Sequence, residues 1–285
     1  MSTTGILTDS TAQFPTPVFD GRNLVNVISL HIEMSGQRYE NGEGLKAADL
    51  EASLINGEGP KVIAPSVDEF TALFTSLSAH YSDILTILHS ADLSATYENA
   101  AKAADALKGQ INIQLVDAHS TAIGLGLVVQ FAAAAAEEGV PPADIERKIR
   151  KLLPKVYSVF CIEGLTYLEN SGYLGPAQAT IGEHLQMLPI YVLENGKLAA
   201  TQKARNYRHL VDILHEFLYE FENLGHIALL QGVPPFEIEA RALRERIVED
   251  FLDTPISEHT ISATLASIIG PRSLGMFVMQ GESDK

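Results

Sequence analysis

Short β-branched segments alternate with longer, alanine-rich stretches through the first half of this 285-residue chain. The strand-like runs fall at residues 5–7, 24–32, 84–88 and 111–116. One of the helical stretches between them opens with a capping-box pattern, Ser66 followed by Glu69. This alternation is typical of an α/β sheet whose strands run mostly parallel. We therefore expect a largely parallel α/β domain over residues 1–155.

The second half of the sequence has a different pattern. A strand-like run at 156–162 precedes two expected short helices, at 165–170 and 182–188, and then Asn195-Gly196, a type I′ turn signal for a hairpin. Expected helices at 209–223 and 237–252 flank a strand at 226–230, and Gly225 stands where a helix C-cap belongs. We expect an α+β domain with some antiparallel pairing over residues 156–285.

Composition excludes several classes of function. A formal net charge of −16 opposes binding to nucleic acid or to an anionic membrane surface, and the sequence has no basic stripe to override it. The basic residues at 147–151 have the spacing of an exposed helix face. The longest apolar stretch, 123–136, is too short to span a membrane, so we expect no stable membrane insertion.

The single cysteine, Cys161, excludes an intrachain disulfide and a cysteine-based zinc site. The histidines lack the paired spacing of a zinc site, and the glycine-rich motifs of nucleotide-binding loops are absent. No signal-peptide pattern opens the sequence. We expect a cytoplasmic protein with no cofactor and no metal.

Asp9-Ser10-Thr11, at the end of the first expected strand, permits two interpretations. An aspartyl phosphotransferase would use Asp9 as its nucleophile. Such an enzyme usually has a second acidic residue two positions further on, where this sequence has Thr11. Alternatively, the three side chains satisfy backbone donors at the carboxyl edge of the sheet, where open α/β sheets bind ligands.

A polar loop, His89-Ser90-Ala91-Asp92-Leu93-Ser94-Ala95-Thr96-Tyr97, joins an expected strand to an expected helix. Hydroxyls and free N–H groups at a helix N-terminus are suited to a carboxylate or a phosphate. A nucleophilic triad of Ser94, a histidine and Asp117 is conceivable, but no Gly-x-Ser-x-Gly elbow surrounds Ser94, which argues against it.

Taken in order, these short motifs resemble the DegV family of bacterial fatty-acid-binding proteins over nearly the whole chain. The matching stretches are residues 7–12, 93–97, 116–117, 124–126, 165–168, 203–205 and 270–271. The resemblance implies two α/β domains with a long-chain fatty acid in an apolar tunnel in the cleft between them. It also implies that the carboxylate is held by hydroxyls and presented to a separate fatty acid kinase.

The resemblance assigns roles to particular residues. The family's Leu-Ser-Gly-Thr loop falls on residues 93–96, with Ser94 as the carboxylate donor beside Thr96, and with Ala95 in place of glycine. Ser10 would help to shape the same pocket. Arg205 matches an arginine expected near the carboxylate or the partner surface.

The sequence also departs from the family pattern. Val62-Ile63 replace a Thr-Ser pair, so that a hydroxyl which helps to hold the carboxylate is missing. Tyr173 stands in place of an arginine, and Ile268-Ile269 and Arg272 surround Gly270-Pro271, where the family commonly has a histidine before and a glycine after. These departures affect two expectations: that the protein passes its ligand to a kinase, and that it prefers a charged head group.

We predict a non-enzymatic protein that binds a long-chain fatty acid, with its head group at Ser94 and the adjacent backbone N–H groups. Two alternatives remain. The first is a phosphotransferase or acyl hydrolase that uses Asp9 or Ser94, and the second is an interaction protein that has lost lipid binding.

Overall fold

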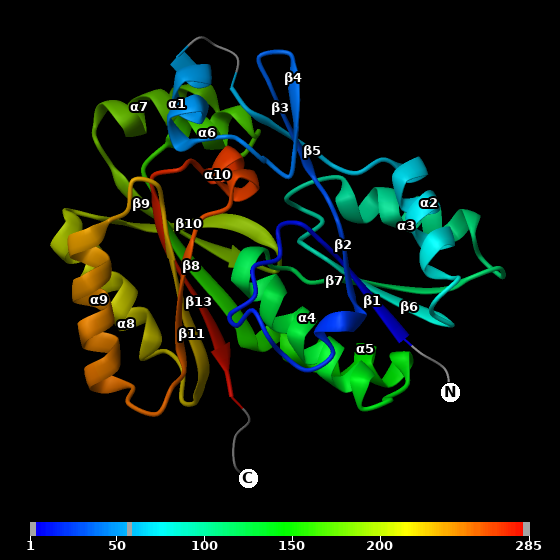
Figure 1. Ribbon diagram of the computed structural model, residues 1–285. Helices are drawn as coiled ribbons and strands as arrows, with labels where there is room; N and C mark the ends of the chain where they lie inside the picture. The colour runs from blue at the N-terminus through cyan, green and yellow to red at the C-terminus, as the bar shows by residue number, and fades with distance from the viewer. Residues whose placement is uncertain (1–3, 56–58, 282–285) are drawn as a thin grey trace. The chain divides into compact units, whose positions relative to one another are not determined.

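The structure, a computed structural model, describes residues 4–55 and 59–281 and divides the chain into two compact units (Figure 1). Unit 1 comprises Met1–His31, Ile63–Pro154 and Asn195–Lys197, and unit 2 comprises Ile32–Val62, Lys155–Glu194 and Leu198–Lys285. The sequence-based division at 155/156 falls beside one of these junctions. The segment Ile32–Val62 belongs to unit 2, although it lies in the first half of the chain.

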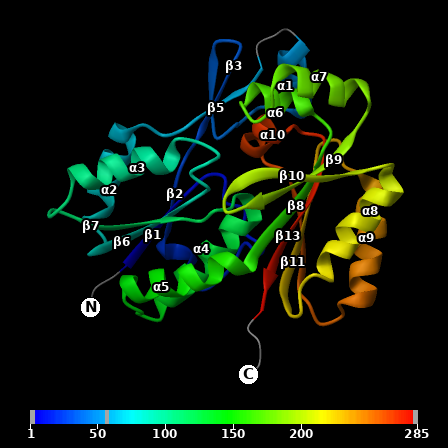
Figure 2. The same ribbon diagram turned by 180° about the vertical axis from the view of Figure 1, so that it is seen from behind.

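Unit 1 contains a four-stranded sheet in the order β2-β1-β6-β7, and every pair of neighbours is parallel. Its strands are β1 (Thr4–Asp9), β2 (Val25–Ile28), β6 (Asp83–Leu88) and β7 (Asn112–Asp117). The helices are α2 (Val67–Leu77), α3 (Thr96–Ala106), α4 (Ala122–Glu137) and α5 (Pro142–Leu152), with short 3₁₀ turns η1 (Arg22–Leu24) and η2 (Leu153–Lys155). The expected parallel α/β arrangement is therefore confirmed. Helices α2 and α3 cover one face of the sheet, and α4 and α5 the other (Figure 2).

The spacing of apolar residues along β1 and α2 explains the core beneath α2 and α3. Leu7 of β1 points toward α2, where Phe70 and Phe74, four residues apart, share one helix face. Both phenylalanines are completely buried, and each contributes about 1.5–3 kcal/mol by leaving water. The predicted capping box is confirmed: Ser66 Oγ accepts from Glu69 N, and Ser66 N donates to the Glu69 carboxylate.

Helix α4 fixes the loop that follows β1. A Cβ atom on Gly126 would lie 2.0 Å from the carbonyl oxygen of Gln13, so only glycine permits this close approach. Gln13 N in turn donates to the carbonyl of Ala122 at 3.1 Å. The backbone just beyond Asp9 is therefore held rigidly against the helix.

Unit 2 is built around a six-stranded mixed sheet in the order β10-β9-β8-β13-β11-β12. Its strands are β8 (Val156–Ile162), β9 (Leu188–Glu194), β10 (Lys197–Ala204), β11 (Leu224–Gln231), β12 (Ile256–Thr260) and β13 (Ser273–Gln280). β13 pairs antiparallel with both β8 and β11, while β11 and β12 are parallel. The antiparallel pairing expected in the second half is thus confirmed, as is the hairpin turn, in which Asn195 and Gly196 both have positive φ.

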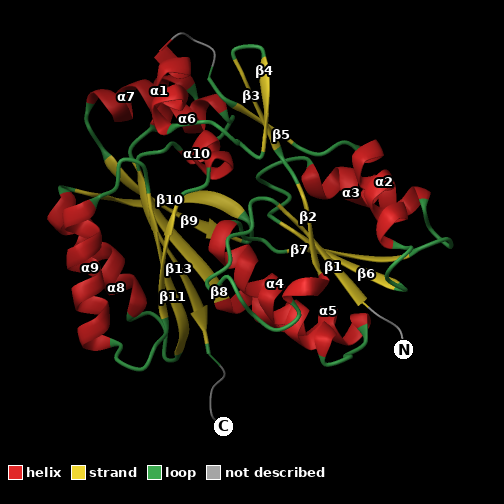
Figure 3. Ribbon diagram, in the orientation of Figure 1, coloured by secondary structure: helices red, strands yellow, loops and turns green. Residues whose placement is uncertain are grey.

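Two long helices, α8 (Tyr207–Leu218) and α9 (Glu237–Asp250), lie side by side on one face of this sheet (Figure 3). Their buried residues, among them Leu210, Leu214 and Leu243, pack with Leu229 and Met276 of the sheet. The remaining strands of the described residues are β3 (His31–Met34), β4 (Gln37–Glu40) and β5 (Lys61–Ile63). The remaining helices are α1 (Ala47–Ile55), α6 (Leu165–Asn170), α7 (Pro176–His184) and α10 (Ala263–Ile269).

Three local expectations were wrong. The run 24–32 is two strands, β2 and β3, because Leu30 N donates to Ser10 Oγ instead of continuing a ladder. The helix expected at 182–188 is α7, which begins earlier because Pro176 occupies its first turn and ends before Gln186, whose φ is +47°. Gly225 lies inside β11, at a register shift between residues 224 and 226, and caps no helix.

Candidate functional site

The carboxyl end of β1 carries a buried carboxylate. Asp9 has no exposed surface, and its Oδ1 accepts hydrogen bonds from Thr11 N at 2.9 Å and Thr11 Oγ1 at 2.6 Å. Its Oδ2 accepts from His89 N at 2.7 Å. Asp9 therefore satisfies backbone donors at the sheet edge, as one of the two sequence interpretations expected. With both oxygens bonded and buried, it is not placed to attack phosphorus.

His89 follows β6 directly and lies against Asp9 because β1 and β6 are neighbours in the sheet. The ring is 1% exposed, and its Nδ1 lies 2.9 Å from Asp9 Oδ2. The Nδ1–H direction is oblique to that contact, which is therefore electrostatic rather than a linear hydrogen bond.

Burial is the largest influence on the pKa of Asp9, and by itself it would raise that pKa. Attraction to the His89 ring and the hydrogen bonds from Thr11 and from the backbone N–H of His89 together outweigh burial, so the pKa of Asp9 lies below its usual value of 3.8. Asp9 is therefore ionised at neutral pH.

Ser94 completes a chain of polar contacts that leads from the buried sheet edge toward solvent. Its Oγ lies 2.7 Å from His89 Nε2 and 2.8 Å from Thr96 Oγ1, and it accepts from Thr96 N at 3.2 Å. Ser94 is half-buried, and Ala95 beside it is exposed. Ala95 is the N-cap of α3 and supplies no side-chain acceptor, so Ser94 Oγ is the group that accepts from the first N–H of the helix, that of Thr96.

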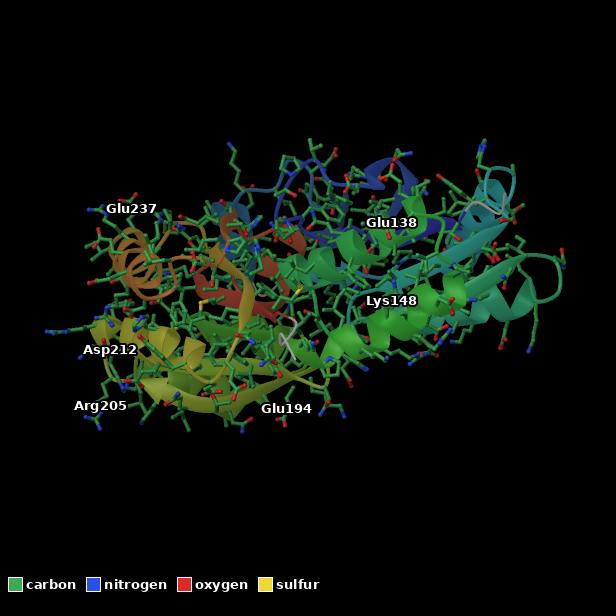
Figure 4. All side chains as sticks on the ribbon, turned by 90° about the horizontal axis from the view of Figure 1, so that it is seen from below. Glu138, Lys148, Glu194, Arg205, Asp212 and Glu237 are labelled. Atoms are coloured by element: carbon green, nitrogen blue, oxygen red, sulfur yellow. The ribbon has the colours of Figure 1, made fainter. Side chains whose placement is uncertain are left out.

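The structure brings some of the predicted site residues together. Ser94, Ala95 and Thr96 form one cluster, whereas the Ser10 hydroxyl, next to Asp9 in sequence, accepts from Leu30 N at 2.9 Å. Of the other predicted residues, Val62 and Ile63 are half-buried in β5, and Arg205 is exposed in unit 2, just after the end of β10. Figure 4 shows the Arg205 side chain extending outward from the ribbon.

Asp117 is not the carboxylate partner of the histidine that contacts Ser94. It accepts from His119 N at 2.8 Å and from Ala91 N at 3.3 Å, and so anchors the start of the polar loop. Sequence reasoning missed His89 as a partner of Ser94. One signal could have found it, since His89 follows β6 at the same sheet edge that Asp9 occupies after β1.

Unit 2 contains a separate cavity of about 440 Å³, which includes Arg205 and the first turn of α8 in its lining. Glu163 organises this lining: it accepts from Tyr207 Oη at 2.6 Å and from Arg272 Nε at 2.8 Å. The hydrogen bond to Glu163, followed by burial, raises the pKa of Tyr207 to about 12. Arg272 is thereby committed to an ion pair with Glu163.

The basic residues of α5 form a solvated helix face, as expected. Lys148 is exposed, while Arg147 and Arg150 pair with Asp144 and Glu146 of the same helix. Among the described residues, no three histidine, cysteine or acidic side chains converge as a metal site would require. Over residues 4–55 and 59–281, every helix is too short or too polar to cross a membrane.

The chain thus combines a parallel α/β unit with a mixed-sheet unit, and it is a two-unit α/β protein. A family model described as "Uncharacterised protein, DegV family" matches residues 3–281. The chain therefore belongs to the DegV family, and the resemblance drawn from its motifs is confirmed.

Individual relatives agree with this assignment. A DegV domain-containing protein of Deinococcus radiodurans is 27% identical over 275 residues, covering 95% of this chain and 96% of the relative. A fatty-acid-binding DegV family protein from Thermus thermophilus matches at a TM-score of 0.85 and 25% identity, covering 98% of this chain and all of the other. The fatty acid kinase B3 protein of Streptococcus pneumoniae, solved with linoleic acid, matches at a TM-score of 0.83 and 21% identity over 98% of this chain and 100% of that protein.

Proposed function

We propose that this protein binds a long-chain fatty acid and that its carboxylate binds at Ser94, with the N-terminus of α3 beside it. The observation that carries the proposal is the hydroxyl of the half-buried Ser94, held by Thr96 and His89 at the start of an 11-residue helix. Membership of the DegV family, and the fatty acid bound by the Thermus thermophilus relative, support it.

The energetics fit a ligand with a small polar head and a long tail. A methylene removed from water contributes about 0.8 kcal/mol, so that ten of them outweigh the loss of one head-group hydrogen bond. Replacing a hydroxyl pair by Val62 and Ile63 is therefore compatible with binding. Ligand binding of this kind makes and breaks no covalent bond, so it requires no catalytic activity of this protein.

The first test is mass spectrometry of the purified protein, in its native form and after organic extraction. We expect one free fatty acid per chain. Ser94→Ala should weaken binding of added palmitic acid about tenfold or more, because a hydrogen bond to a charged group is worth about 1.5–3 kcal/mol. Ser78→Ala, the same change at the exposed C-terminal end of α2, serves as the matched control. A protein that is purified empty and takes up no added fatty acid would contradict the proposal.

The head group can be tested separately. We propose that the apolar Val62 and Ile63 reduce the preference for a charged head group. The affinities for palmitic acid and for its methyl ester should therefore lie closer together here than in a Val62→Thr, Ile63→Ser double variant. Equal ratios in the two proteins would show that these positions do not sense the head group.

We further propose that the bound fatty acid is presented to a fatty acid kinase in the cytoplasm. The support is the fold shared with the Streptococcus pneumoniae fatty acid kinase B3 protein. The buried free thiol of Cys161 is compatible with a reducing compartment. The test is acyl phosphate formation when the loaded protein is mixed with such a kinase and ATP, and Arg205→Ala probes whether this exposed arginine contributes. Loaded protein that yields no acyl phosphate with the kinase would contradict this proposal alone.

A further inference from the structure

Ser94, His89 and Asp9 form a linear chain of groups whose burial increases inward. Ser94 is half-buried, His89 is 1% exposed and Asp9 has no exposed surface. The distances are 2.7 Å from Ser94 Oγ to His89 Nε2 and 2.9 Å from His89 Nδ1 to Asp9 Oδ2. We propose that Ser94 is a nucleophile which accepts the acyl group of an ester or thioester and releases it to water as a free carboxylic acid.

The hydrogen-bond directions around Ser94 suit this chemistry. Thr96 N donates to Ser94 Oγ, and the Thr96 hydroxyl lies at 2.8 Å and can donate as well. The Ser94 proton is then free to point at His89 Nε2, provided that the ring proton sits on Nδ1. The ionised Asp9, whose Oδ2 lies 2.9 Å from Nδ1, favours that tautomer by electrostatic attraction, without a linear hydrogen bond, and stabilises the imidazolium that forms when Nε2 takes a proton. Asp9 acts through His89 and is thus a positioning residue.

The N-terminus of α3 supplies the electrostatic environment for a developing oxyanion. The helix is 11 residues long and begins at Thr96, two residues after Ser94. Tyr97 N and Glu98 N are in its first turn, where N–H groups have no partner within the helix. Preorganised N–H donors of this kind stabilise the tetrahedral intermediate of acyl transfer.

The reaction balances with groups that the protein holds. Ser94 Oγ attacks the acyl carbonyl carbon while His89 Nε2 takes the hydroxyl proton. Collapse of the tetrahedral intermediate breaks the bond to the alkoxide or thiolate leaving group, which receives that proton from His89. A water molecule then attacks the acyl-serine, with His89 again accepting and returning a proton, and the products are a carboxylic acid and free Ser94. The expectation of a long acyl chain rests on the proposed function, whereas the reactivity of Ser94 does not.

The direct test is labelling of the full-length protein with an alkyl fluorophosphonate, followed by peptide mass spectrometry. We expect one label, on Ser94, that is absent in Ser94→Ala. His89→Gln should slow labelling at least a hundredfold because it removes the general base. His119→Gln is the matched control, since this half-exposed histidine also follows a strand end and pairs with a carboxylate, Asp117, at 3.5 Å. It should label at the wild-type rate.

Hydrolysis of p-nitrophenyl butyrate and palmitate provides the second readout. Turnover that follows the label across the variants, with a pH profile lost in His89→Gln, would support the inference. Fatty acid binding in a protein that labels nowhere, or labels equally in His89→Gln, would overturn the inference and leave the proposed function intact. Labelling of Ser94 in a protein that binds no fatty acid would instead support Ser94 as a nucleophile and contradict the proposed function.

Discussion

Asp9→Asn should destabilise the protein by about 2–5 kcal/mol. An asparagine in this place has one acceptor oxygen where the carboxylate has two. If that oxygen keeps the two bonds from Thr11, the new amide group faces the N–H of His89, which loses its 2.7 Å acceptor. A buried donor without a partner costs about 1–3 kcal/mol, and the loss of charge from the two remaining bonds adds about 1–2 kcal/mol.

The assay is urea-induced unfolding followed by circular dichroism, with hydrogen exchange of β1 peptides to localise the change. Asp117→Asn is the control, because Asp117 also ends a strand and accepts a backbone N–H, from His119 at 2.8 Å, but its side chain is 17% exposed and water can replace it. We expect that control to lose less than about 1 kcal/mol. Equal losses in the two variants would refute the reasoning.

The lowered pKa of Asp9 also predicts how the stability difference between wild type and Asp9→Asn changes with pH. The pKa of Asp9 is lower in the folded protein than its usual value of 3.8, so the folded state binds fewer protons at this group than the unfolded state. The stability that this shift contributes is present above the unfolded-state pKa and is lost as the pH falls through the folded-state value. The difference in stability between wild type and Asp9→Asn should therefore shrink in acid, below about pH 4. A difference that grows in acid would show that the shift has the opposite sign.

Three further changes have expected effects on stability. Ser66→Ala removes the capping box of α2 and should cost about 1 kcal/mol in urea unfolding, and an unchanged midpoint would show that Glu69 alone suffices. Phe74→Ala should cost about 3–5 kcal/mol because the ring is completely buried, and a loss below about 1 kcal/mol would mean that the core refills the space. Gly126→Ala should lower the melting temperature, since its Cβ would lie 2.0 Å from Gln13 O, and a stable variant would show that the loop after β1 can move away.

The features that sequence reasoning predicted correctly are those with local causes. The parallel sheet of unit 1 follows from alternating strand and helix patterns, and the α2 capping box from two side chains three residues apart. The hairpin at Asn195-Gly196 follows from two residues that tolerate positive φ. In each case the sequence pattern that indicates the feature is contained in short segments, although the strand pairs of the sheet itself join residues far apart in sequence.

The features that were missed depend on distant partners. Asp9 and His89 are 80 residues apart, and only the adjacency of β1 and β6 brings them together. Ile32–Val62 likewise belongs to unit 2 although the chain on both sides of it, Met1–His31 and Ile63–Pro154, belongs to unit 1. The sequence predicted the polar loop around Ser94 as a binding site. The contact of Ser94 with the buried Asp9 carboxylate, through His89, could be predicted only with knowledge of the strand order.

The position of β13 bears on how the protein is made. This strand, Ser273–Gln280, is the last strand within the described residues 4–55 and 59–281, yet it lies between β8 and β11 in the interior of the unit 2 sheet. Unit 1 has all four strands of its sheet by residue 117 and can begin to fold while synthesis continues. In unit 2, the edges of β8 and β11 that pair with β13 must instead remain unpaired until synthesis has passed residue 280. A nascent or prematurely terminated product would therefore expose the edges of β8 and β11, where chaperones bind and aggregation begins.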